Sequence, residues 1–180
     1  MKEKEDNDLI RSLQESRTYT KWDEIKKWIP SAIILALAFY FSMNRGTYGL
    51  LDNIDLVIHE AGHLVFFIFG RYIYTLGGTL MQIILPSLIT WYFFRNSYRT
   101  GIQFGLLWLG QNFINISVYA ADARARKLPL LGGNNVYHDW NYLLGEVGLL
   151  NYDIEIGYIF FGTAILIFIV SVIMPLIIKN

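Results

Sequence analysis

Long apolar runs alternate with short polar breaks along the chain, and five of these runs are candidate membrane-spanning helices. The clearest is "YIFFGTAILIFIVSVIMPLII", residues 158–178, which holds no charged residue. As a helix it is long enough to cross the roughly 30 Å of hydrocarbon in a bilayer. Four earlier runs are shorter or more polar: 29–43, 48–70, 79–94 and 101–121. The pattern predicts an all-α integral membrane protein of about five transmembrane helices, although the short run 79–94 also suits a re-entrant element.

The polar stretches between these runs set the domain organisation. Residues 1–27 are charged and predict a cytoplasmic N-terminal segment, whereas residues 28–180 form the membrane domain, with a polar loop at 122–157. Basic residues favour the cytoplasmic side of a membrane. With five crossings this rule predicts a multi-pass protein with a cytoplasmic N-terminus and an outside C-terminus. This predicted orientation rests on Lys21, Lys26 and Lys27 before the first run and on Arg124, Arg126 and Lys127 after the fourth.

The composition is that expected of a protein whose partner is the lipid bilayer. Of the 180 residues, 54% are hydrophobic and 16% aromatic, which is high for a soluble domain. The formal net charge is zero, so nothing indicates a nucleic-acid partner, and the absence of cysteine excludes disulfides.

The second run contains, among its apolar residues, polar residues whose placement in a membrane costs free energy. Asp52, Asp55, His59 and His63 fall on one face of a helix, with Glu60 at its edge. Ionisable groups inside a membrane usually face a protein interior or a wet cavity and mark function. Within this face, "HEAGH" is an H-E-x-x-H motif: two histidines at i and i+4 can bind Zn²⁺, and the glutamate beside them can take a proton from bound water. A chance match would leave the cluster of polar residues unexplained.

A catalytic zinc site needs a third protein ligand, and two places in the sequence compete for that role. Asp122 ends a polar stripe on the fourth run, but it also suits a simple interfacial residue. His138 and Asp139 lie in the polar loop, where they could bind the metal or support a ligand. Either of them could instead cap a short helix over 139–150.

The "HEAGH" segment, together with "NFINISVYAAD" near the end of the fourth run, resembles the site-2 protease family of intramembrane zinc metalloproteases. The resemblance implies a zinc site inside the helix bundle, with Zn²⁺ held by His59, His63 and Asp122 and with Glu60 as the catalytic base. It also implies that Asn112 or Asn115 steadies the substrate strand. The chain departs from the family's pattern because Ala123 follows the aspartate where the family has glycine, and because no PDZ domain fits in its length.

We favour Asp122 as the third ligand because a rigid helix holds geometry better than a segment beyond the glycine-rich "LGGNN". The stretch 70–80 has the composition of a short strand whose edge could capture an unwound substrate, or of an ordinary connecting loop.

The expected function is hydrolysis of peptide bonds within or near transmembrane segments of membrane protein substrates. Two alternatives remain: a non-catalytic membrane scaffold or chaperone that keeps the fold, and a small transporter with a polar helix interface.

Overall fold

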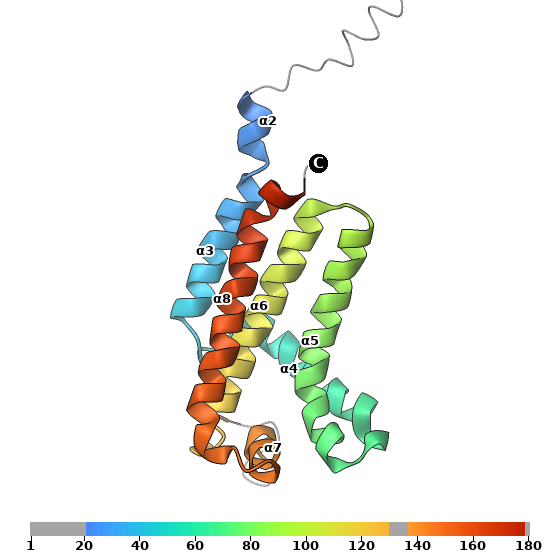
Figure 1. Cartoon of the computed structure of the whole chain (residues 1–180), viewed down its shortest axis with the longest axis vertical. Helices are drawn as coiled ribbons and strands as arrows, with labels where there is room; N and C mark the ends of the chain where they lie inside the picture. The colour runs from blue at the N-terminus through green and yellow to red at the C-terminus, as the bar shows by residue number, and fades with distance from the viewer. Residues whose placement is uncertain (1–20, 130–136, 179–180) are drawn as a thin grey trace, which may run out of the picture.

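The computed structural model describes residues 21–129 and 137–178, and every regular element within these ranges is helical (Figure 1). The all-α class predicted from the sequence is therefore confirmed for the described residues. The elements are α2 (Lys21–Lys26), α3 (Ile29–Met43), α4 (Leu50–Phe66), η1 (Phe67–Phe69), α5 (Arg71–Arg95), α6 (Arg99–Ala121), α7 (Asp139–Glu146), η3 (Leu150–Tyr152) and α8 (Asp153–Ile177).

Four long helices form a bundle with α6 at its centre. Helices α3, α5 and α8 all pack against α6, and the four run roughly parallel (Figure 1). One apolar cluster joins α3, α6 and α8 through Ile34, Leu107, Ile114, Ala164 and Phe168. Helix α4 instead runs obliquely behind the bundle and packs mainly against α5.

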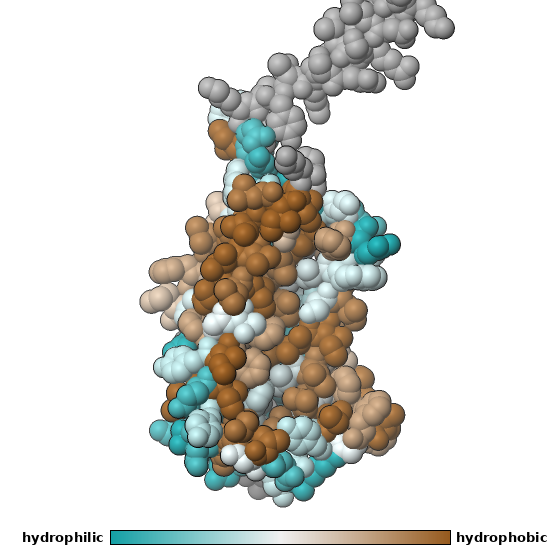
Figure 2. Space-filling view, viewed as in Figure 1, coloured by the Kyte–Doolittle hydropathy of each residue, from teal (hydrophilic) through white to brown (hydrophobic). Residues whose placement is uncertain are grey.

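Three helical segments are long and apolar enough to cross a membrane: Glu24–Met43, Arg71–Arg95 and Leu150–Ile177. They cover the predicted runs 29–43, 79–94 and 158–178, the last except for residue 178. The middle one is longer than predicted, because α5 continues unbroken for 25 residues. Large apolar side chains stay exposed along the bundle, and Figure 2 shows them covering much of its visible face. These features support a membrane protein.

Helices α4 and α6 fall outside that set because their apolar sequences are interrupted by polar side chains that turn inward. Helix α4 buries Asp55, His59 and His63 while it exposes Val57 (68%) and Leu64 (76%). An ordinary surface helix in water shows the reverse arrangement. The outer face of α4 is thus suited to lipid, although the helix has only 17 residues and lies obliquely.

The ends of the bundle differ from the predicted topology. Helix α3 begins and α8 ends at the same end of the bundle (Figure 1). Five complete crossings would place these two points at opposite ends, so α4 does not add a full crossing in this arrangement. Helix α6 ends at the other end of the bundle. The basic residues after α6 therefore lie opposite those that precede α3, although the sequence analysis placed both groups on one side.

The stretch 70–80 is neither the predicted strand nor a connecting loop, because α5 starts at Arg71 and runs through it. Gly77 and Gly78 lie in this stretch, and here they serve helix packing. A Cβ on Gly62 of α4 would overlap the Gly77 carbonyl, and a Cβ on Gly77 would come within 2.7 Å of the Gly62 carbonyl oxygen. Small residues let two membrane helices approach this closely.

We expect Gly62→Ala to destabilise the protein, because the added methyl group must push α4 away from α5. Overpacking of this kind costs about 1–3 kcal/mol. The matched control is Gly162→Ala in α8, where the new Cβ meets no atom within 4 Å. Thermal unfolding in detergent should show a lower midpoint for Gly62→Ala than for Gly162→Ala. Equal midpoints in the two variants would show that the close helix contact contributes nothing.

Candidate metal centre

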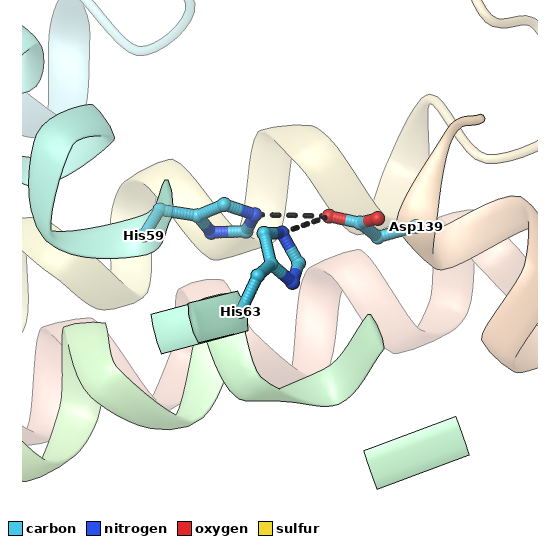
Figure 3. Close-up of side chains that lie close together, drawn as sticks. All are labelled: His59, His63 and Asp139. Carbon is cyan, nitrogen blue, oxygen red and sulfur yellow. Dashed lines mark hydrogen bonds and ion pairs between the residues drawn. The ribbon is translucent and has the colours of Figure 1, made fainter. Parts of the chain in front are cut away.

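Two histidines from α4 and one aspartate from α7 meet at a single point (Figure 3). His59 and His63 are one helical turn apart, so their rings project from the same face of α4. The Nε2 atoms of His59 and His63 lie 2.9 and 3.3 Å from the same carboxylate oxygen, Oδ2 of Asp139. Candidate ligand atoms of the three residues all lie within 4.8 Å of one another.

The other ring nitrogen of each histidine faces a hydrogen-bond acceptor. Nδ1 of His63 lies 2.8 Å from the backbone carbonyl of Tyr74, and Nδ1 of His59 lies 2.9 Å from Oε1 of Gln82. A carbonyl oxygen can only accept, so each Nδ1 must carry the proton and donate it. In a neutral imidazole the proton on Nδ1 leaves the lone pair on Nε2. Both lone pairs then face Asp139.

This arrangement calls for a positive charge between the three groups. Two lone pairs and a carboxylate oxygen repel one another unless a proton or a cation lies among them. Donors placed about 2.0–2.2 Å from a tetrahedral Zn²⁺ are roughly 3.3–3.5 Å apart, which is close to the spacing found here. Two imidazoles and one carboxylate, each imidazole supported by a second hydrogen bond, are the donor set of many catalytic zinc sites.

The ionisation state of Asp139 suits it to bind a metal ion. Burial alone would raise the pKa of its carboxyl group, but the imidazoles of His59 and His63, when they donate a proton to it, lower the pKa to about 2. The group is therefore ionised at neutral pH and supplies a negative oxygen.

Helix α7 places Asp139 through contacts with the end of α6. The side chain of His138 caps α7 by accepting a hydrogen bond from the backbone N–H of Asn141, which confirms the predicted capping role. The Asp139 backbone N–H donates to the Tyr119 hydroxyl at 3.1 Å, and the Asn141 amide donates to the carbonyl of Ala123 at 2.8 Å. On its other face α7 buries apolar side chains against α6. The predicted helix over 139–150 ends early, at Glu146.

Asp122, which the sequence analysis favoured as the third ligand, lies outside this group. It follows the last residue of α6, and its two carboxylate oxygens accept hydrogen bonds from the backbone N–H groups of Lys127 and Leu128. Its Oδ2 also lies 3.4 Å from Nε2 of His138. Asp122 thus closes the turn that leads toward α7 and supports its capping residue. The geometry favours Asp139, the alternative on the loop.

The three ligand candidates open onto a cavity of about 470 Å³. Glu60 and Asn115 also line this cavity, and the Glu60 side chain is exposed. Asn112 does not reach it: this side chain is buried and binds Asp55 and Gln82. Of the two asparagines predicted to position a substrate, only Asn115 is accessible.

Sequence analysis missed two groups that support the histidines. Gln82 is a lone amide in an apolar run, a signal that could have identified it, since polar side chains inside membrane helices usually bind a neighbouring helix. Tyr74 contributes only its backbone carbonyl, for which no sequence signal exists.

No protein-family model, curated protein or solved structure matches the chain, so the function must be argued from the site itself.

We expect Asp139→Ala to weaken zinc binding far more than Asp122→Ala does. The first substitution removes a candidate ligand atom, whereas the second loosens a turn two contacts away and should cost about tenfold, the lower end for residues that support a ligand. Zinc titration against a competing chelator measures both affinities. Strong zinc loss in Asp122→Ala, with normal binding in Asp139→Ala, would restore Asp122 as the ligand.

Proposed function

We propose that this protein is an intramembrane zinc metalloprotease that hydrolyses peptide bonds in membrane protein substrates. The observation that carries the proposal is the convergence of two imidazole Nε2 atoms on the Asp139 carboxylate beside a cavity that Glu60 also lines. The H-E-x-x-H spacing places Glu60 directly after a ligand candidate, on the side of α4 that faces this cavity.

The residues of the chain have distinct roles in this proposal. His59, His63 and Asp139 would hold the metal at the edge of the cavity. Zn²⁺ bound there would acidify a water molecule and polarise the substrate carbonyl. Glu60 accepts the proton of that water and returns it to the departing amine. Because Glu60 is exposed and lines the cavity, its carboxylate can meet a water molecule there.

The substrate is a transmembrane segment that unwinds locally, because a helix engages its carbonyls in its own hydrogen bonds. Asn115 can hold such a strand. Its amide nitrogen donates to Asp55 Oδ2 at 3.3 Å, which leaves its carbonyl oxygen for a substrate N–H. Five tyrosines give the cavity apolar walls with polar tips: Tyr48, Tyr74, Tyr119, Tyr137 and Tyr142.

In the membrane we propose four crossings, formed by α3, α5, α6 and α8, with α4 embedded obliquely between lipid and the bundle. Amide side chains reduce the hydropathy of α6, but its neighbours in the bundle cover them. The end of the bundle where α3 begins carries Lys26 and Lys27 and also the α5–α6 turn with Arg95 and Arg99. Although Arg124, Arg126 and Lys127 lie at the other end, the basic residues at the α3 end, together with Lys21, favour the cytoplasmic side for this end by the positive-inside rule, and α3 begins and α8 ends there.

We expect purified protein to carry about one Zn²⁺ per chain and His59→Ala or His63→Ala to lose it. The matched control is His138→Asn, which removes the third histidine but keeps an N-cap acceptor for α7. Elemental analysis of these four proteins and of the His59→Ala, His63→Ala double variant provides the measurement. Full zinc occupancy in the His59→Ala, His63→Ala double variant would exclude this metal site.

We expect Glu60→Gln to keep zinc and to lose about a thousandfold or more in cleavage, because glutamine has nearly the same shape but takes up no proton. A library of single transmembrane segments in detergent or vesicles provides the assay, and Glu146→Gln at the exposed end of α7 is the control. Wild-type cleavage by Glu60→Gln would show that the base is another residue. Zinc binding without cleavage of any segment by the native protein would favour the scaffold alternative.

A further inference from the structure

A chain of hydrogen bonds joins a buried carboxylate to the His59 imidazole across three helices. Asp55 of α4 accepts from the Asn112 amide of α6 at 3.2 Å, and the Asn112 oxygen accepts from the Gln82 amide of α5 at 3.3 Å. The Gln82 oxygen then lies 2.9 Å from Nδ1 of His59. All four side chains are buried, with Asp55 at 0% exposure. Water therefore has little access to these four side chains and does not readily replace the hydrogen bonds between them.

The chemistry of its first member gives this chain a direction. An ionised carboxylate only accepts hydrogen bonds, so Asn112 must turn its NH₂ group toward Asp55. The Trp108 carbonyl, 3.1 Å from the same nitrogen, requires the same orientation. The oxygen of Asn112 then faces Gln82, which must turn its own NH₂ group toward it. This leaves the Gln82 oxygen facing His59, and the imidazole must present an N–H.

Three donors stabilise the carboxylate at the start of the chain. Besides Asn112, the indole N–H of Trp108 donates to Asp55 Oδ1 at 2.8 Å and the Asn115 amide donates to Oδ2 at 3.3 Å. Hydrogen bonds donated to a carboxylate favour its charged form. The orientation of Asn112 is therefore fixed by two acceptors, and Asp55 is fixed by three donors.

We infer that Asp55, Asn112 and Gln82 are positioning residues that keep the proton of His59 on Nδ1 and so leave Nε2 to bind the metal. His63 needs no such relay, because the Tyr74 carbonyl accepts its Nδ1–H directly. An imidazole with the proton on Nε2 would direct an N–H at the cavity and could not bind zinc there. This inference rests on the proposed zinc site, but the position of the proton is a property of the metal-free protein as well.

The first test reads the tautomer by ¹⁵N NMR with labelled histidine in metal-free Asp139→Ala protein, where no carboxylate competes for a proton at Nε2, well above the ordinary imidazole pKa of about 6.5. The chain has only three histidines, so assignment by substitution is direct. In this Asp139→Ala protein both His59 and His63 should be Nδ1–H tautomers. When Asn112→Leu is added the Gln82 amide is released, so His59 should show a fraction of Nε2–H while His63 stays unchanged. An Nε2–H tautomer of His59 in the Asp139→Ala protein, or no change when Asn112→Leu is added, would overturn the inference.

The second test measures zinc affinity by chelator competition. Gln82→Leu should lose about ten- to hundredfold, as expected for a group that supports a ligand. Gln82→Glu should stay closer to the native affinity, because a carboxylate still accepts the Nδ1–H. The control is Gln103→Leu, which removes an equally buried amide that joins α6 to Ser31 of α3 and Ser171 of α8, far from the histidines in sequence and outside their contacts.

The outcomes separate the relay from the proposed function. Equal zinc affinities in Gln82→Leu and Gln103→Leu would overturn the relay while the zinc site stands, and so would an equal loss in Gln82→Leu and Gln82→Glu. A native protein that binds no zinc would reject the proposed function, yet the tautomer measurement would still decide the relay.

Discussion

The structure depends on one electrostatic constraint: α4 must keep its polar face out of lipid. Asp55, His59 and His63 are buried on that face, whereas the opposite side of the helix is apolar and exposed. Unpaired polar groups are costly in a nonpolar environment, so each of these side chains needs partners from neighbouring helices. Helix α5 supplies Gln82 and a carbonyl, α6 supplies Trp108 and two asparagines, and α7 supplies Asp139. The oblique course of α4 gives one polar face contacts with all three.

Close packing and polar contact occur together where α4 crosses α5. Gly62 and Gly77 bring the two backbones into contact, and Gly78 has no side chain because the His59 ring occupies that space. The glycines therefore set the position of α5 relative to the histidines. The Gln82 side chain lies one turn farther along α5 and reaches Nδ1 of His59. A larger residue at any of the three glycines would move the support of the imidazole as well as the helix.

Local patterns were enough to predict the helical class, three of the apolar segments and the polar face of α4, because these follow from periodicity alone. The histidine pair was equally accessible, since i and i+4 spacing fixes a shared face. The third ligand candidate could not be identified from local patterns, because its position depends on how the chain after α6 folds back. We expected a residue at the end of a rigid helix, Asp122, to be the third ligand. Asp122 instead accepts hydrogen bonds within the turn after α6 and contacts His138, the residue that caps α7 next to Asp139. Likewise, the stretch 70–80 with Gly77 and Gly78 was interpreted as a strand or a loop, because the sequence of α5 does not show that a glycine of α4 packs against it.

The separate origin of Asp139 couples metal binding to the docking of a small helix. With α7 undocked, the site retains two imidazoles, which bind a metal more weakly than three ligands do. A metal held by all three residues would therefore favour the docked state, and by mass action free metal at one hundred times its dissociation constant would stabilise that state by up to about 2.7 kcal/mol. Helix α7 has only eight residues, and its cap and first turn bind the end of α6. The metal would then hold α7, which forms one wall of the cavity, in its docked position. Depletion of zinc would release this wall as well as remove the Lewis acid.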